Sequence, residues 1–377
     1  MSSLFVVIFA AVAQGLLFLI HWGFYKILVR FLLITNPGSL LALKITLGIL
    51  SLSVLVSSIL VDRYDNPAVR VIYDIAYFWL GLLFYLLLAA LLTWLGVKIF
   101  SLFSVTLNTK LLAEVLFLLA IIISVCGAIN AGFIRVTHLK IGLPNLPESW
   151  QGKTAVWVSD IHLGAVRNYS FANEVATQIQ NLQPDIIFIG GDLYDGVAAD
   201  LDKLAQPFAK LSAPEGTYFI TGNHEEFTAS TKFVDAVRRS GIKELDNEMI
   251  SLDGLQIIGV NYKDTGSEQN YKTIMQSLNL DPALPSILLK HSPYRPQIAQ
   301  AFGIDLQLSG HVHRGQIFPV GLISYLVFQG YDFGLKHLGE LTVYISSGTG
   351  TWGPPMRVLT TPEIVQIEFY PSPFQNR

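Results

Sequence analysis

The sequence has little charge and almost no cysteine. Charged residues make up 14% of its 377 residues and hydrophobic residues 51%, whereas an ordinary soluble domain has roughly 25% charged residues. This balance excludes a disordered chain and is too apolar for a soluble monomer. The single cysteine, Cys126, excludes an intrachain disulfide and a cysteine-bound metal cluster. No tract of basic residues is present, so we expect no nucleic-acid partner.

Long uncharged runs fill the first third of the chain. Residues 1–25, 75–97 and 115–134 contain no charged side chain, and residues 45–61 form a shorter run that residues 40–43 extend if the Lys44 ammonium reaches the interface. About 20 apolar residues cross a bilayer core. We therefore predict a membrane domain over residues 1–140 with four transmembrane helices. Basic residues are nearly equal on its two sides, so the positive-inside rule assigns no orientation.

The remainder of the chain alternates between short β-rich runs and helical patterns. The predicted strands are residues 155–159, 186–189, 218–220, 256–260, 287–290, 306–308 and 343–346, and the predicted helices are residues 171–182, 201–211, 231–240 and 271–278. Such alternation is typical of a layered α/β domain with helices covering the sheet faces. We expect this domain to span residues 150–372.

Polar loops follow five of the predicted strands. They are Asp160-Ile161-His162, Gly190-Gly191-Asp192-Leu193-Tyr194-Asp195, Gly222-Asn223-His224-Glu225, His291-Ser292-Pro293 and Gly310-His311-Val312-His313. Ligands of open α/β sheets bind beyond the carboxyl ends of the strands, so we expect these loops to meet at one place.

A cleft with so many imidazoles and carboxylates indicates metal binding. These groups are costly to bury without partners, and divalent cations offset that cost by accepting their lone pairs. Oxygen and imidazole ligands without thiolate suit Mn²⁺, Fe or Zn²⁺. The ligands exceed one tetrahedral site, so we expect two ions about 3.5–4 Å apart, a spacing that activates water at phosphorus. Each motif alone has an ordinary explanation as a turn or helix cap, but the five together favour metal.

The ordered motifs resemble the calcineurin-like metallophosphoesterase family. The resemblance rests on Asp160-x-His162, Gly191-Asp192-x-x-Asp195, Gly222-Asn223-His224-Glu225, His291 and Gly310-His311-x-His313. Residues 309–316 and 348–357 are similar to the bacterial membrane-associated, YkuE-like branch, which often has Gly where this chain has Arg314. The resemblance implies a four-layer αββα sandwich, two β-sheets between helices, and an integral protein of the bacterial inner membrane.

The resemblance also implies a distribution of roles. The first metal would bind Asp160, His162, Asp192 and His313, and the second would bind Asp192, as a bridge, with Asn223, His291 and His311. His224 follows a ligand but is assigned no metal, so we expect it to act as an acid or charge stabiliser at the leaving group. Asp195 resembles the family carboxylate that orients this histidine.

These features predict a membrane-anchored, dinuclear-metal phosphoesterase. It would hydrolyse phosphate mono- or diesters by attack of metal-activated water. Arg314 and Arg357 are candidate substrate contacts, with structural salt bridges as the alternative. Residues 317–328 are unusually apolar and either pack beneath the sheet or form a rim facing the bilayer, which would suit lipid phosphoesters or pyrophosphates.

The sequence leaves two other classes of function as alternatives. A membrane sensor or scaffold with an inactive phosphoesterase domain is the main alternative, although a dead domain has no chemical need for the complete residue set. A transporter would need charged or broken helices near the midplane of the bilayer, and the uncharged runs contain little of either. P-loop, dinucleotide and nucleophile-elbow motifs are absent from the sequence. No protein partner is predicted.

Overall fold

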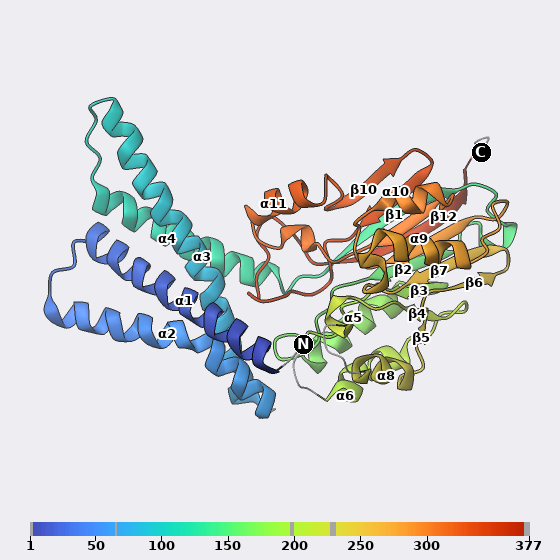
Figure 1. The fold of residues 1–377 in the computed structure, drawn as a ribbon, viewed down its shortest axis with the longest axis horizontal. Coiled ribbons are helices and arrows are strands. Elements are labelled where there is room, and N and C mark those ends of the chain that lie inside the picture. Colours follow the sequence, from blue (N-terminus) through green and yellow to red (C-terminus); the bar gives the residue numbers. More distant parts are fainter. Residues whose placement is uncertain (1–2, 65, 197–199, 227–230, 373–377) are drawn as a thin grey trace. The chain divides into compact units, whose positions relative to one another are not determined.

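The computed structural model describes residues 3–64, 66–196, 200–226 and 231–372. The chain divides into two compact units (Figure 1). One comprises Met1–Ile129 together with Gly353–Met356, and the other comprises Asn130–Trp352 together with Arg357–Arg377. The two units differ in kind, the first being helical and the second α/β.

Four helices form the first unit: α1 (Ser3–Phe31), α2 (Pro37–Arg63), α3 (Pro67–Leu102) and α4 (Thr109–Asn130). By length and composition all four could cross a membrane, and four is the number of spans that the sequence predicts. Asn-Pro pairs start two of them, because the Asn36 and Asn66 side chains accept hydrogen bonds from the first turn while proline occupies the first helical position.

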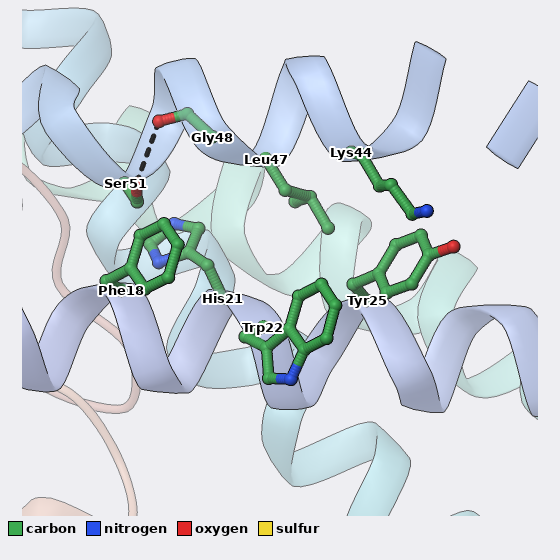
Figure 2. Close-up of a pocket in the computed structure, with 8 residues that line it drawn as sticks. All are labelled: Phe18, His21, Trp22, Tyr25, Lys44, Leu47, Gly48 and Ser51. Atoms are coloured by element: carbon green, nitrogen blue, oxygen red, sulfur yellow. Dashed lines mark hydrogen bonds between the residues drawn. The ribbon is translucent and has the colours of Figure 1, made fainter. Parts of the chain in front are cut away.

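A pocket of about 200 Å³ lies between α1 and α2. It is lined by Phe18, His21, Trp22, Tyr25, Lys44, Leu47, Gly48 and Ser51 (Figure 2). The Nδ1 atom of His21 lies 2.7 Å from the carbonyl oxygen of Leu17, and its Nε2 accepts a hydrogen bond of 2.9 Å from the indole of Trp79. Both ring nitrogens are therefore satisfied within the helical unit, as a polar ring among apolar helices requires.

Two six-stranded sheets form the middle of the α/β unit. The first has the order β1 (Arg135–Leu143), β12 (Glu363–Pro371), β2 (Thr154–Val158), β3 (Ile186–Ile189), β4 (Thr217–Phe219) and β5 (Lys243–Glu244). The second has the order β10 (Gly334–Leu338), β11 (Leu341–Ile345), β9 (Leu306–Ser309), β8 (Ser286–Lys290), β7 (Leu255–Val260) and β6 (Glu248–Leu252). The strands β2 to β5 are parallel, and so are β7, β8, β9 and β11.

Successive side chains of a strand point to opposite faces of the sheet. One face of each sheet packs against the other sheet and the opposite face packs against helices, so the unit has four layers. Trp157 and Phe188 of the first sheet share a buried cluster with Ile257 and Leu289 of the second, so these faces pack against each other. The opposite face of the first sheet packs on α5 (Tyr169–Asn181), α6 (Leu201–Ala205) and α8 (Lys232–Arg239). The opposite face of the second packs on α9 (Glu268–Ser277) and α10 (Pro296–Ala301). Figure 1 shows the two groups of helices on either side of the sheets, and the predicted αββα sandwich is confirmed.

The structure contains strands that the sequence pattern did not predict, among them β1, β5, β6, β10 and β12, and it also differs from the expectation at a helix and settles the place of an apolar stretch. The α/β unit begins before residue 150, because β1 pairs with β12 at the sheet edge, where a half-exposed strand gives a weak apolar pattern. The helix expected over residues 201–211 ends at Ala205, and a separate 3-10 turn starts after Pro207, which has no N–H to continue an α-helix. Within the apolar stretch 317–328 lies a helix, α11 (Val320–Val327), with no buried residue, so it does not pack beneath the sheet.

Candidate metal centre

Each predicted ligand lies just beyond the carboxyl end of a parallel strand. Asp160 and His162 follow β2, Asp192 follows β3, and Asn223 follows β4 and begins the short helix α7 (Asn223–Glu226). His291 follows β8, whereas His311 and His313 follow β9. The two sheets thus supply ligands from five strand ends, and the sandwich brings them together.

Five of these residues have a left-handed backbone. The φ angles are +55° at Asp160, +53° at His162, +51° at Asp192, +72° at His311 and +51° at His313. Non-glycine residues rarely adopt this region, and each instance costs of order 1–3 kcal/mol unless the surrounding structure holds it. Such a concentration at one place is typical of a functional site.

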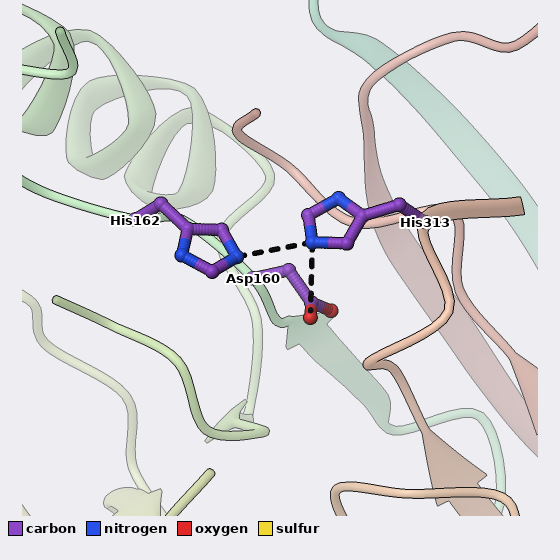
Figure 3. A group of neighbouring side chains, drawn as sticks. All are labelled: Asp160, His162 and His313. Carbon is purple, nitrogen blue, oxygen red and sulfur yellow. Dashed lines mark hydrogen bonds and ion pairs between the residues drawn. The ribbon is translucent and has the colours of Figure 1, made fainter. Parts of the chain in front are cut away.

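The first cluster contains Asp160, His162 and His313 (Figure 3). The Nε2 atoms of the two imidazoles lie 3.0 Å apart, and Nε2 of His313 lies 3.5 Å from Oδ1 of Asp160. All three side chains are buried. Two imidazole lone pairs that face each other need a proton or a cation between them, and the adjacent carboxylate favours the cation.

The second cluster contains Asp192, His291 and His311. The Asn223 side-chain oxygen lies 3.2 Å from Nε2 of His291 and 2.8 Å from Nδ1 of His311. The other nitrogen of His291, Nδ1, lies 2.8 Å from the carbonyl oxygen of Gly190. That carbonyl favours a proton on Nδ1 and leaves Nε2 directed at the cluster, as in metal-binding histidines generally.

Asp192 lies between the two clusters. Its Oδ2 atom is 3.3 Å from Nε2 of His291 and 3.9 Å from Nε2 of His162. Its other oxygen, Oδ1, accepts a hydrogen bond of 2.9 Å from the backbone N–H of His224. A carboxylate placed in this way can serve both clusters.

Strong electrostatic coupling joins these groups. Burial alone would lower the pKa of His291, but the charge and hydrogen bond of Asp192 outweigh it and raise that pKa to about 9. Burial, followed by the charge of His291, lowers the pKa of His311 to about 3. A cation at these ligands would take the place of the proton. The buried nitrogen and oxygen donors, with no thiolate among them, therefore fit a divalent metal.

His224 and Asp195 lie beside the first cluster. Nδ1 of His224 is 3.0 Å from the backbone oxygen of Asp195, and the carboxylate of Asp195 is 4.0 Å from the same nitrogen. That carboxylate is nearer to Nδ1 of His162, at 3.6 Å. His224 is also near enough to His162 and Asp192 to complete a third potential ligand group. Asp195 thus lies against both histidines rather than His224 alone.

Glu225 is a site residue to which the sequence analysis gave no role. Its buried carboxylate accepts hydrogen bonds from the backbone N–H groups of Asp192 and Gly222, both at 2.9 Å, and of Tyr194 at 3.1 Å. Burial, followed by the charge of Asp192, raises the pKa of Glu225 to about 7. Glu225 therefore ties the loop after β3 to the loop after β4. Its place directly after the Gly222-Asn223-His224 motif was the available signal.

The two candidate arginines have different environments. Arg357 is buried, and its guanidinium donates to the backbone oxygens of His313, Ser347 and Gly350. Through these bonds the guanidinium holds the loop of His313, so the geometry does not support the expected contact of Arg357 with substrate. Arg314 is exposed, with its guanidinium 4.4 Å from the ring centroid of Phe333. Its φ of +51° explains why glycine suits this position.

Two glycines are required by close approach to the carboxylates. A Cβ atom on Gly222 would overlap the side chain of Asp192, and one on Gly310 would overlap the side chains of Asp160 and Ser159. Both positions therefore need glycine for the carboxylates to keep their places.

Comparison with known proteins agrees with this geometry. The family model for calcineurin-like phosphoesterases matches residues 154–315. An "Uncharacterized metallophosphoesterase" of Aquifex aeolicus is 34% identical over 66% of this chain and 97% of its own length. A "Transmembrane protein with metallophosphoesterase domain" of Danio rerio is 32% identical over 65% of this chain and 60% of its own length. "Uncharacterized metallophosphoesterase YkuE" of Bacillus subtilis is 29% identical over 61% and 84% of the two lengths.

Proposed function

Because the chain belongs to the calcineurin-like metallophosphoesterase family, we propose that it hydrolyses phosphate mono- or diesters at a pair of divalent cations. The observation that carries the proposal is the position of Asp192 between two buried clusters of metal-binding groups. The first ion would bind Asp160, His162, Asp192 and His313. The second would bind Asp192, Asn223, His291 and His311. Mn²⁺, Fe and Zn²⁺ suit these ligands.

Bound cations supply two things, a lowered pKa for water and neutralisation of charge on the phosphate. The chain supplies the rest. Gly190 and Asp195 orient the rings of His291 and His224 through their backbone oxygens. The carboxylate of Asp195 lies 3.6 Å from Nδ1 of His162, so its negative charge favours a proton on that nitrogen and would leave Nε2 for the metal.

His224 is the candidate acid for the leaving group. It is only partly buried, and burial lowers its pKa while the charges of Asp192 and Asp195 oppose that effect. The carbonyl of Asp195 fixes the direction of the ring. A proton delivered to the departing oxygen would contribute about 10²- to 10⁴-fold to the rate.

Substitution of His224 separates the role of acid from that of ligand. We expect His224→Ala to lower kcat by about 10²-fold or more while both metals stay bound, and to lose less on a substrate with a nitrophenol leaving group, which needs no proton. Metal content by mass spectrometry decides the matter. Loss of an ion from this variant would make His224 a ligand, as its proximity to His162 and Asp192 allows.

The chain is a membrane protein, since it has four long apolar helices and relatives named as transmembrane proteins. We propose that this membrane is a bacterial inner membrane, which its bacterial relatives support, and that phosphoesters or pyrophosphates of lipids are among its substrates. Membrane fractionation tests the location. A sensor or scaffold without activity is the alternative, and it predicts no turnover of any nitrophenyl phosphoester with Mn²⁺, Fe²⁺ or Zn²⁺.

A further inference from the structure

Helix α11 exposes an apolar surface that a soluble domain would bury. The helix has no charged residue, and the exposed fractions of Leu322, Ile323 and Leu326 are 59%, 62% and 74%. Together with Phe318, Tyr325 and Val327, these side chains place six exposed large apolar residues within ten positions. Contiguous exposed patches of this kind mark a surface that binds something apolar.

The helix is attached to the metal centre at both ends. Before it, the loop of His311 and His313 leads directly into Gly315, where a Cβ atom would overlap the backbone of Gly321. After it, the ring of Phe328 lies edge-on to His311, with centroids 6.0 Å apart. An exposed aromatic residue, Trp352, lies edge-on to His224 with ring centroids 6.1 Å apart. Apolar side chains therefore flank the centre beside both histidines.

The partner with matching chemistry is the bilayer that holds the chain. Four residues separate the end of α4 at Asn130 from the start of β1 at Arg135, and an extended chain of that length reaches only about 14 Å. The last candidate span thus tethers the start of the α/β unit within that reach of the membrane. Because tethering raises the effective concentration of lipid, a short helix suffices for contact. Arg314, which follows the ligand His313 in the chain, is exposed, and its positive charge would attract anionic headgroups.

We propose that α11 is an interfacial helix that inserts its apolar side chains among the lipids and holds the metal centre at the level of the headgroups. The docking itself rests on the membrane spans, whereas the consequence that lipid-borne phosphoesters are the preferred substrates rests on the proposed function. Other coverings of the helix, by the spans of the same chain or by a second copy, are outcomes of the test.

Quenching by lipids tests the docking without reference to activity. In the full-length Cys126→Ser protein, Leu326→Cys carries an environment-sensitive fluorophore, and Tyr370→Cys, exposed at the end of β12, is the matched control. Both are reconstituted in phosphatidylcholine–phosphatidylglycerol vesicles containing spin-labelled lipids. We expect about twofold or greater quenching at position 326 and little at position 370. The proposal is overturned if the labels at positions 326 and 370 are quenched equally, or if the emission of the label at position 326 shifts to the blue without quenching.

Turnover provides the second measurement. For Leu326→Glu we expect the ratio of the rate on a phospholipid in vesicles to that on a soluble nitrophenyl diester to fall about tenfold, because a charge opposes insertion. Tyr370→Glu should leave the ratio unchanged. An unchanged ratio in Leu326→Glu contradicts the proposal. A wild-type protein inert on both substrates counts against the proposed function, and the quenching result still decides whether α11 docks.

Discussion

Glu225 gives a sharp test of how the loops of the metal centre are held. Its carboxylate accepts three backbone hydrogen bonds, two of which come from Asp192 and Gly222 on neighbouring loops. Glu225→Gln keeps the shape but replaces one acceptor oxygen by an NH₂ group that faces a donor. Placing the amide oxygen toward Asp192 and Gly222 leaves the N–H of Tyr194 without its acceptor. At least one buried N–H is therefore unsatisfied.

The size of the effect follows from that lost bond. A buried donor without an acceptor costs about 1–3 kcal/mol. The cost falls on the arrangement that brings Asp192 to the two clusters, so it lowers the affinity for metal. With about 1.4 kcal/mol for each factor of ten, the affinity should fall roughly 5- to 150-fold. Activity at saturating metal should return toward the wild-type value, because Glu225 itself touches neither metal nor substrate.

Competition with a chelator measures the affinity, and hydrogen exchange of residues 190–194 reports whether the loop has loosened. Glu174→Gln, on the exposed side of α5, is the matched control and should change neither quantity. If Glu225→Gln binds metal like the wild type and its loop amides exchange at the wild-type rate, the three hydrogen bonds do not hold the site and the reasoning is refuted.

Three further substitutions probe the surroundings of the centre. Gly310→Ala should remove metal from the first cluster, because its Cβ overlaps Asp160, and metal analysis that finds both ions would contradict the expectation. Arg357→Met should weaken metal binding about tenfold or more, since the guanidinium holds the loop of His313. At saturating metal the KM of this variant should equal that of the wild type. A raised KM in the variant with its full metal content would instead make Arg357 a substrate contact. Burial, and then the charge of a nearby arginine, lowers the pKa of Lys290 from 10.5 to about 7. Between pH 7 and pH 10.5 the folded state therefore binds fewer protons than the unfolded state. The free energy of unfolding thus increases as the pH rises through this range. From pH 7 to 9 the gain is about 2 kcal/mol, which Lys290→Met should lack; melting curves that differ from the wild type equally at both pH values would refute this.

Much of the fold is readable from local pattern. Runs without charge predict the four long helices, and the alternation of short apolar runs with helical patterns predicts the layered sandwich. Elements at a sheet edge or on the surface are harder to predict from the sequence. β1 is an edge strand whose partner, β12, lies more than two hundred residues away, and α11 has no buried face to give a helical period.

The candidate site divides in the same way. The seven proposed ligands follow strands within short motifs, and the structure brings them into two adjacent clusters. Supporting contacts depend on folding and are not written in the spacing. Glu225 acts on the loop of Asp192, and Arg357 acts on the loop of His313, which is 44 residues away. A buried arginine and a substrate-binding arginine look alike in sequence, and only their surroundings distinguish them.

Metal content of the purified full-length chain tests the central claim most directly, with Asp192→Asn measured beside it. If Asp192 serves both clusters, the wild type holds two divalent ions per chain and the variant loses both together with all turnover. A wild-type chain saturated by a single ion, or an Asp192→Asn protein that retains two, would contradict a paired centre joined by this carboxylate.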